Sequence, residues 1–453
     1  MNTNDRTTLP LQTIADALAD LREADEWQVT AYHERQAQLY VIGDQTEARR
    51  DVSDSRIEVV LHNAHEPHAP DMTGPASGAS TVTLLESDTG DMSSIFARLR
   101  YAATMASLTD NQPYPLPEPP ADGFPTIETS DPLLSGEGSE ALADTMDRLR
   151  AAVASRSGVR LSSAEIYATR SQRSLRNSRG LSASSQSTRV YLDFVLIAHE
   201  DGKEAEFHAE VERRRLADMM IAGTVDAYAT FARHSLRARP PTTATGPVLL
   251  SGAALPEFFG PIIFNTSGQA QYQKVSRIRP GEFVSGEAPR GDRLTLTSDA
   301  TRPFGLRSAP FDDEGIPAQT VAVIRDGIFT RPWADARYAA YLGITPTGSF
   351  ANLTVPTGAW SLDALRAAES GPVYEIVAFS WFNPDVISGD FACEIKLGYR
   401  HDANGTTPIK GGSLTGNVFT ALADARLSSE AFSDGAYFGP AGIRFAALTV
   451  AGG

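Results

Sequence analysis

Three of the chain's eight histidines fall close together in the segment His62–His68, which reads HNAHEPH. Imidazoles spaced three residues apart, with Glu66 among them, form a donor set that binds transition metals. Pro67 and Pro70, however, predict a loop after a strand, so no helix pre-aligns the rings. We therefore interpret this cluster as loop histidines with incidental metal affinity and not as a catalytic centre.

Two segments of the C-terminal half could also carry chemistry. The acidic run Asp312–Glu314 supplies hard oxygen atoms of the kind that bind cations. Cys393, the chain's one cysteine, shares an alternating face with Phe391 and Ile395, which predicts a buried, hydrophobic thiol and not a zinc ligand. Because a lone cysteine forms no internal disulfide, the sequence also fits a reducing compartment, and we expect a cytoplasmic protein.

Several short motifs of this half occur in a fixed order. FDDEGIP at 311–317 precedes an apolar strand and an Asp-Gly turn at 326–327, and SGDF at 388–391 and PIKGGSLTGN at 408–417 follow later. Together these motifs resemble the C-terminal domain of the TldD/TldE (PmbA) proteins. The resemblance extends back to about residue 15 and so covers nearly the whole chain.

The resemblance implies one of two kinds of subunit. A TldD-type subunit is a zinc peptidase carrying His-Glu-x-x-x-His, in which two imidazoles hold the metal and the glutamate takes a proton from the bound water. A TldE-type subunit lacks that motif and pairs with the active one. In the family the motif follows a Val-Leu-Leu strand, which is present here as Val248–Leu250.

The segment after this strand reads LPEFFGPII at 255–263, and no histidine occurs between His234 and His401. Without an imidazole beside it, Glu257 is interpreted as a helix-surface charge. The chain therefore looks TldE-like, and we predict no catalytic residue and no metal-binding residue in it.

A TldE-like subunit implies a heterodimer with a TldD-like catalytic subunit, with zinc in that partner and no cofactor in this chain. The implied substrates are unfolded peptides, which strand addition to an exposed sheet edge would hold through their main chain. By motif position, the residues expected along the substrate channel are Phe311, Asp312, Asp313, Glu314, Asn352 and Cys393.

Two alternatives remain open at this point. One is a divergent hydrolase that acts alone through Glu257, Cys393 or the His62 cluster. The other is a peptide-binding module that works without any peptidase. The histidine-free stretch at the start of the C-terminal domain ranks the supporting subunit first.

Composition narrows the classes of partner. The formal charge of −16 repels nucleic acid and anionic membranes, so neither is expected as a partner. The sequence has no run of about eighteen apolar residues that would span a bilayer, and the segment Met1–Arg6 predicts no export signal. A length of 453 residues predicts two or three domains.

The elements that must position these residues are of mixed type. Helical periodicity marks 11–24 and 91–108, while alternation marks strands at 28–32, 37–42 and 56–61. The proline-rich segment 111–125 predicts a first boundary, since proline disrupts helices and central strands. We therefore expect an N-terminal α/β domain over 1–120.

A middle α/β domain is expected over 121–240. It holds strands near 160–169 and 188–199, a long helix over 211–234, and a basic stretch at Arg170–Arg189 that is interpreted as a solvated loop or a contact for an acidic partner. From 241 to 453 a short helix at 253–259 precedes many short, glycine-punctuated strands. The expected fold class is α+β, with antiparallel sheets and helices followed by a mainly antiparallel, barrel-like C-terminal domain.

Overall fold

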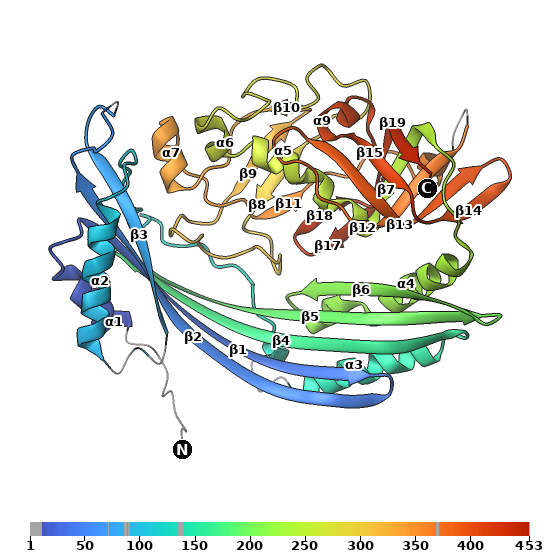
Figure 1. Ribbon diagram of the computed structural model, residues 1–453, viewed down its shortest axis with the longest axis horizontal. Coiled ribbons are helices and arrows are strands. Elements are labelled where there is room, and N and C mark those ends of the chain that lie inside the picture. The colour runs from blue at the N-terminus through green and yellow to red at the C-terminus, as the bar shows by residue number, and fades with distance from the viewer. Residues whose placement is uncertain are drawn as a thin grey trace.

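The computed structural model describes residues 11–70, 72–85, 88, 91–134, 139–367 and 371–452. A long curved sheet forms one body, and the C-terminal half folds into a second body above its concave side (Figure 1). The segment Met1–Arg6, in which we predicted no export signal, lies outside the described residues. No helix in the described ranges is long and apolar enough to cross a bilayer.

The curved sheet is antiparallel throughout and has the strand order β3-β2-β1-β4-β5-β6. Its strands are unusually long because polar and apolar residues alternate without interruption over most of their length, as in β5. The strands are β1 Glu26–Ile42, β2 Gln45–His65, β3 Ala76–Leu85, β4 Val159–Asn177, β5 Ser182–Glu200 and β6 Lys203–Arg213.

Helices cover the apolar face of this sheet at both of its ends. At one end α1 and α2 bury Ile14 and Leu99 against β1, β2 and β3, and at the other end α3 and α4 bury Leu149 and Val225 against β4, β5 and β6. These helices are α1 Leu11–Ala19, α2 Met92–Ala106, α3 Ser139–Ala154 and α4 Ile221–Arg237, with 3₁₀ turns at Pro132–Leu134 and Leu216–Met219.

The boundary that we predicted near residue 120 falls in the extended, proline-rich segment between α2 and α3. β1, which precedes this segment, nevertheless pairs with β4, which follows it, from Gln28–Asn177 to Ile42–Ser163. The regions 1–120 and 121–240 therefore share one sheet. The C-terminal region begins after α4, where the chain leaves that sheet.

The C-terminal body contains a closed barrel and a second sheet. Strands β12, β7, β19, β15 and β13 close on one another, because β12 pairs with both β7 and β13. The second sheet has the order β10-β9-β8-β11-β18-β17. The expected α+β class with a barrel-like C-terminal domain is thereby confirmed.

The strands of this body are β7 Ala244–Ser251, β8 Leu296–Asp299, β9 Thr320–Arg325, β10 Ile328–Phe329, β11 Asn352–Thr354, β12 Val373–Trp381, β13 Asp390–Asp402, β14 Gly405–Ile409, β15 Ser413–Asn417, β16 Arg426–Leu427, β17 Ala431–Asp434, β18 Tyr437–Pro440 and β19 Gly442–Ala451. Its helices are α5 Gly260–Asn265, α6 Gly268–Tyr272, α7 Ala336–Leu342, α8 Leu362–Arg366 and α9 Val418–Ala421, with 3₁₀ turns at Gly252–Ala254, Pro256–Phe259 and Leu422–Asp424.

Two helix predictions were wrong in extent. The helix expected over 211–234 begins only at Ile221, because the alternation of Phe207, Ala209 and Val211 keeps the chain in β6 as far as Arg213. The helix expected over 253–259 consists of two short 3₁₀ turns, and the two phenylalanines of the second turn, Phe258 and Phe259, are buried in the barrel core.

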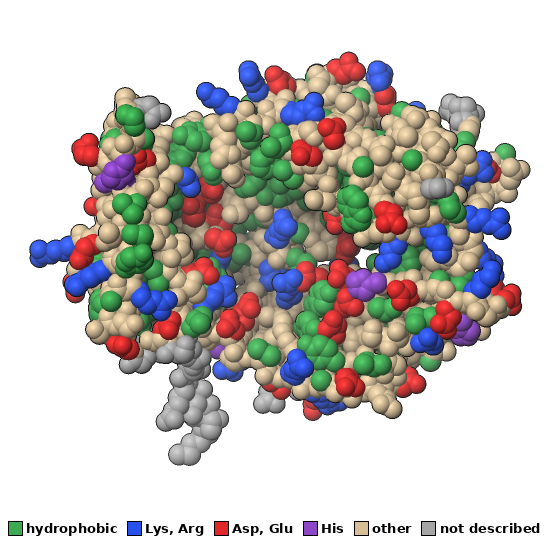
Figure 2. Space-filling model, in the orientation of Figure 1, with side chains coloured by type: hydrophobic (Ala, Val, Ile, Leu, Met, Phe, Trp, Pro, Cys, Tyr) green, Lys and Arg blue, Asp and Glu red, His purple; other side chains and the backbone are tan. Residues whose placement is uncertain are grey.

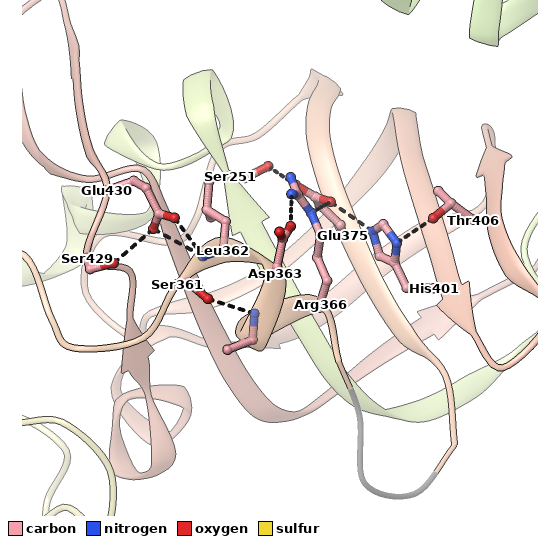
Figure 3. A network of polar contacts seen from close by, with 11 residues as sticks. Ser251, Ser361, Leu362, Asp363, Arg366, Glu375, His401, Thr406, Ser429 and Glu430 are labelled. Atoms are coloured by element: carbon pink, nitrogen blue, oxygen red, sulfur yellow. Dashed lines mark hydrogen bonds and ion pairs between the residues drawn. The ribbon is translucent and has the colours of Figure 1, made fainter.

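A buried carboxylate network ties the barrel strands to α8 (Figure 3). Glu375 on β12 accepts hydrogen bonds from Ser251 Oγ at 2.8 Å and from Arg366 Nε at 2.8 Å, and His401 Nε2 lies 2.8 Å from its Oε2. Burial opposes ionisation, but the bonds from His401, Arg366 and Ser251 outweigh it and hold the pKa of Glu375 at about 2. The carboxylate is therefore an ionised cross-link between three strands and a helix.

We predict that Glu375→Gln lowers the free energy of unfolding by about 2–4 kcal/mol near pH 6, because it leaves Arg366 without its counter-charge. The ordinary pKa is 4.5 and the folded one about 2, so this stabilisation is fully present above pH 4.5 and is lost as pH falls toward 2. Urea unfolding at pH 6 and pH 3 measures both effects. The exposed Glu394→Gln on β13 is the control, and equal stability of Glu375→Gln and wild type at pH 6 would contradict the prediction.

Candidate functional site

A cavity of about 810 Å³ separates the end of the curved sheet from the C-terminal body. Figure 2 shows this face of the molecule hollowed between the two bodies, with acidic and basic side chains gathered in the hollow. The lining residues of the sheet and α4 are Phe207, His208, Glu210, Val211, Arg213, Met220, Gly223, Thr224, Ala227, Tyr228 and Phe231. The opposite wall includes Ser251, Gly252, Ala253, Glu257, Arg307, Phe350, Trp381, Phe382, Lys396, Phe432 and Asp434.

The sheet contributes an edge strand to this cavity. β6 pairs with β5 on one side only among the described strands, so its outer main-chain groups face away from the sheet. Phe207 packs edge-on against Tyr228 of α4, and the Lys396 ammonium lies 4.7 Å from the Phe207 ring. An unpaired strand beside an aromatic wall is suited to binding an extended peptide.

Charged residues link the two walls at the mouth. Arg213 of β6 donates to Asp434 of β17 at 2.9 Å, which fixes the separation of the bodies there. The apolar rim includes Trp381, 56% exposed, and Met220, 70% exposed. Met220 has a φ of 45°, a left-handed conformation that is strained for a residue with a side chain. Exposed apolar side chains at a cavity rim favour contact with another chain or a ligand.

Glu257 lies on the cavity wall at the position where the family motif would fall. Its neighbours Phe258 and Phe259 are fully buried in the barrel core, which leaves the Glu257 side chain on the cavity side, and partial burial raises its pKa. Cys393 is 1% exposed and its thiol donates to the Leu414 carbonyl at 3.4 Å. Burial raises the pKa of this thiol to about 12, so the thiolate that zinc requires is disfavoured.

These donors do not fit a catalytic zinc ion, which takes three protein ligands and keeps one position open. The only lining imidazole among the described residues is that of His208, and it is held by Asp193 of the sheet at 2.5 Å. Groups of three potential ligands occur within the described ranges at His65, His68 and Asp110 and at Asp193, His208 and Glu210. Neither group includes Glu257 or Cys393.

The acidic loop 311–316 docks the C-terminal body onto the β4–β5 hairpin. Phe311 is 1% exposed and packs with Leu175, Leu181 and Phe124, and the Arg173 guanidinium lies 4.6 Å from the Phe311 ring. Arg173 also forms an ion pair with the Asp313 carboxylate. Phe311 and Asp313 therefore hold the two bodies together.

Asp312 and Glu314 are the inward carboxyls of the same loop. Asp312 accepts from the amides of Glu314, Ile316 and Ser349, and with Phe311 and Asp313 it lines a second cavity of about 320 Å³. This cavity shares Arg307, Phe350 and Ala351 with the larger one. Glu314 accepts from the Ala336 amide, and burial together with the negative charge of Asp335 raises its pKa to about 8.

Asn352 supports a loop that receives a buried arginine. Its Nδ2 donates to Ser308 Oγ at 2.8 Å and its Oδ1 accepts from the Arg307 amide at 3.0 Å. Arg214, directly after β6, donates to the carbonyls of Leu306 and Ser308 in that loop. Asn352, like Glu314 and Cys393, does not line either cavity, so its link to the larger cavity runs through Arg307.

Sequence reasoning missed Arg173 and Arg214 as the residues that position these cavities. Arg173 lies in the basic stretch Arg170–Arg189, which forms most of a β-hairpin and pairs within the chain, for example through Arg179 and Glu26 at 2.5 Å. An acidic FDDEG loop elsewhere in the same sequence was the available signal for the partner of Arg173. Nothing local distinguishes Arg214 from its neighbours Arg213 and Arg215.

Family models match two parts of this chain. A model described as the PmbA/TldA metallopeptidase central domain matches residues 133–233, and the model of the C-terminal domain matches residues 243–452. The chain is similar to the metalloprotease PmbA of Escherichia coli O157:H7, at 30% identity over 38% of each protein. A TldD homologue of Haemophilus influenzae is 26% identical over 38% of this chain and 40% of its own length. These matches span about two fifths of the curated relatives' length.

Solved structures share the whole fold. TldE from Thermococcus kodakarensis superposes with a TM-score of 0.79 at 17% identity, covering 98% of this chain and all of that one. A Bacteroides thetaiotaomicron protein described as a modulator of DNA gyrase superposes with a TM-score of 0.80 at 16% identity, over 98% of both chains. At these identities the likeness shows a common fold.

Gly315 allows the acidic loop to approach the hairpin tip. Its φ is 90°, and a Cβ built there would lie 2.8 Å from Leu181 Cδ1. We predict that Gly315→Ala lowers the free energy of unfolding by about 1–3 kcal/mol and increases protease cleavage between the bodies. Gly246→Ala, where a Cβ meets open space, is the control. A Gly315→Ala protein as stable and as protease-resistant as the control would disprove this role.

Glu314 makes folding sensitive to pH. Its ordinary pKa of 4.5 rises to about 8 in the folded protein, so the folded state holds an extra proton between these values and loses stability as pH rises from 4.5 to 8. We predict that Glu314→Gln, which keeps an acceptor for the Ala336 amide, is more stable than wild type at pH 9 by on the order of 1–3 kcal/mol and nearly equal at pH 4.5. Urea midpoints at the two pH values test this, and a constant difference between the proteins would refute it.

Proposed function

Because the chain belongs to the PmbA/TldD metallopeptidase family, we propose that it is a non-catalytic, TldE-like subunit of a heteromeric TldD/TldE-type zinc metallopeptidase. The complex would process unfolded peptides in the cytoplasm, with the zinc ion held by the TldD-like partner. This chain would shape the peptide chamber and stabilise the complex.

The observation that carries this proposal is the composition of the cavity wall. The cavity lies between the sheet edge and the barrel, yet the wall segment 251–263 offers Glu257 without a histidine or a cysteine. A peptide could enter such a cavity, but the groups that activate water on a metal are not assembled there. The cavity therefore suits binding more than cleavage.

The walls indicate how a peptide would be held. The outer edge of β6 would pair with the main chain of an extended peptide and so accept many sequences. The stacked pair Phe379–Phe382, with ring centroids 4.7 Å apart, and Trp381 would contact apolar side chains from the opposite wall. The charges of Glu210, Lys396 and Asp434 lie close enough to this path to bias its preferences.

The channel residues that we predicted from motif position lie at different distances from the proposed path of the peptide. Asp312 and Asp313 line the smaller cavity and would contact a peptide that extends from the larger one, while the buried Phe311 would support this loop without touching the peptide. Glu314, Asn352 and Cys393 line neither cavity, so they would support the cavity walls without touching the peptide. The exposed rim residue Met220 is the surface that we assign to the partner subunit.

We predict that zinc and proteolysis depend on the partner. The chain purified alone should hold no stoichiometric zinc at Glu257 or Cys393 and should not cleave an unstructured peptide. Co-expression with the TldD-like subunit of the same genome should give a stable complex with zinc and activity, measured by elemental mass spectrometry and peptide cleavage. Cleavage by the lone chain that Cys393→Ala or Glu257→Gln abolishes would overturn the proposal in favour of a hydrolase acting alone.

A matched pair of variants tests the role of the cavity within that complex. Trp381→Ala at the rim should raise the KM for peptide at least several-fold and leave assembly intact, because it removes a large apolar contact to the peptide. Tyr101→Ala, an exposed aromatic residue on α2 outside the cavity, should change neither. Glu257→Gln should leave kcat within about twofold of the wild-type complex, since zinc chemistry resides in the partner. A loss of kcat of a hundredfold or more in Glu257→Gln would contradict this division of roles.

A further inference from the structure

The end of β2 brings two histidines over the end of α2, far from the cavity. His65 is the last residue of β2, His68 lies in the loop that follows, and Asp110 lies just beyond α2. One potential ligand atom of each lies within 4.8 Å of the others. The side chains of His65 and Asp110 are only 12% and 13% exposed.

Asp110 is fixed by backbone donors. Its Oδ2 accepts from the amides of His68 at 2.8 Å and Ala69 at 2.7 Å, while Oδ1 lies 2.9 Å from His65 Nε2. These bonds, that of Ala69 foremost, hold the pKa of Asp110 below its usual range. Oδ2 thus binds the amides of the loop, whereas Oδ1 faces the His65 imidazole and is the oxygen that could bind an ion.

Both imidazoles are oriented by backbone carbonyls. His65 Nδ1 lies 3.2 Å from the Asn63 carbonyl, and His68 Nε2 lies 2.8 Å from the Ser107 carbonyl. A ring that donates its one N–H to a carbonyl carries its lone pair on the other nitrogen, as metal-bound histidines do. In the tautomers that donate to these carbonyls, the lone pair of His65 is on Nε2, beside the Asp110 oxygen, and that of His68 is on Nδ1.

The 2.9 Å between His65 Nε2 and Asp110 Oδ1 has two interpretations. In the neutral Nε2–H tautomer His65 donates directly to Asp110, and its Nδ1 meets the Asn63 carbonyl without a proton; in the Nδ1–H tautomer the Nε2 lone pair faces the carboxylate, and an ion between them removes that repulsion. A divalent ion bound at about 2.0–2.2 Å would place the two ligand atoms about 3.3 Å apart at a tetrahedral angle, a shift of a few tenths of an ångström.

The backbone holds this arrangement in place. Gly78 of β3 packs against the end of α2 so closely that a Cβ there would lie 1.7 Å from the Ala106 carbonyl oxygen. Ser77 and Asn111 exchange backbone hydrogen bonds of 2.9 and 3.2 Å, which anchors the residue after Asp110. The Ser107 carbonyl closes the C-terminus of α2, and the negative end of a helix dipole favours a nearby cation.

We propose that His65, His68 and Asp110 form a binding site for a divalent transition-metal ion of the Zn²⁺ class. Two imidazoles and one carboxylate suit such an ion better than Mg²⁺ or Ca²⁺, which prefer oxygen ligands alone. Three protein ligands leave a position for water. The site is separate from the zinc ion that the proposed function assigns to a partner subunit.

The ion would reinforce the contact between the sheet and the C-terminal body. Asn111 Oδ1 accepts from Arg337 Nη2 at 2.9 Å, and the Gln112 carbonyl accepts from Tyr341 OH at 2.6 Å. Both partners lie on α7 of the C-terminal body or at its end. Fixing Asp110 therefore fixes the start of the segment that α7 contacts.

The second group, Asp193, His208 and Glu210, serves as a comparison. His208 is 41% exposed there, only its Nε2 has a described partner, and the Tyr191 hydroxyl donates to both carboxylates. Neither the imidazole nor the carboxylates are therefore left oriented toward an ion. It provides a matched control, since His208→Gln removes one exposed imidazole without touching the first group.

The test is Co²⁺ and Zn²⁺ binding by the full chain after chelator treatment at pH 7.5. We expect one equivalent of Co²⁺ with micromolar or tighter affinity and a visible absorption band, displaced by Zn²⁺, and a higher unfolding temperature with either ion. His68→Gln and Asp110→Asn should each weaken binding at least tenfold and remove the thermal shift, while His208→Gln should change neither.

Four outcomes would overturn the site. They are binding only at millimolar ion, binding unchanged in His68→Gln, binding lost in His208→Gln, and a thermal shift that survives Asp110→Asn. Because Asp110→Asn also alters the loop, the exposed His68→Gln decides the matter if the Asn variant unfolds. Far-ultraviolet circular dichroism without metal identifies that case.

Discussion

The buried guanidinium of Arg214 fixes the spacing on which the rest of this structure depends. Arg214 is 8% exposed and donates to the carbonyls of Thr188 on the sheet and of Gly305, Leu306 and Ser308 in the C-terminal body. Burial lowers its pKa to about 10, so it remains charged near neutral pH. No carboxylate pairs with it among the described side chains. Five donors and several fixed carbonyls define one geometry, which a single carboxylate would not.

The cavity is a consequence of that spacing. Arg214 and the docked 311–316 loop hold the bodies together at one place, and Arg213 with Asp434 holds them at the mouth, so the space between these points stays open. The sheet supplies an unpaired edge and the barrel supplies an aromatic wall. Binding surface and structural support are thus built into one chain, and the wall segment 251–263 contributes one carboxylate, Glu257, without a histidine or a cysteine beside it.

The sequence predicted element types well where periodicity was uninterrupted. Alternation identified strands of the sheet, and glycine and proline punctuation identified the barrel. The sequence did not reveal that β1 pairs with β4. The proline-rich segment between these strands indicates a boundary and carries no information about pairing across it. The helix start at Ile221 was missed because the competing β alternation extends to Arg213.

The candidate site was harder to predict from the sequence, because residues that contact one another in it are far apart along the chain. Asp110 is separated by 42 residues from the loop that it caps, and Arg173 by 140 from the Asp313 that it pairs with. Local motifs identified the histidine loop and the acidic loop, but only the fold identified their partners. The segment after Val248–Leu250 is an exception, since its lack of histidine can be seen in the sequence alone.

Two buried glutamates of the C-terminal body show how the barrel differs electrostatically from the junction between the two bodies. Glu375 in the barrel meets a guanidinium, an imidazole and a hydroxyl, and its pKa falls to about 2 despite burial. Glu314 at the junction of the bodies meets mainly other carboxyls and one amide, and its pKa rises to about 8. Near neutral pH the barrel network is therefore ionised and complete, while the junction retains a proton. It follows that a change in pH acts on the contact between the bodies, and so on the cavity, before it acts on the barrel that forms one of its walls.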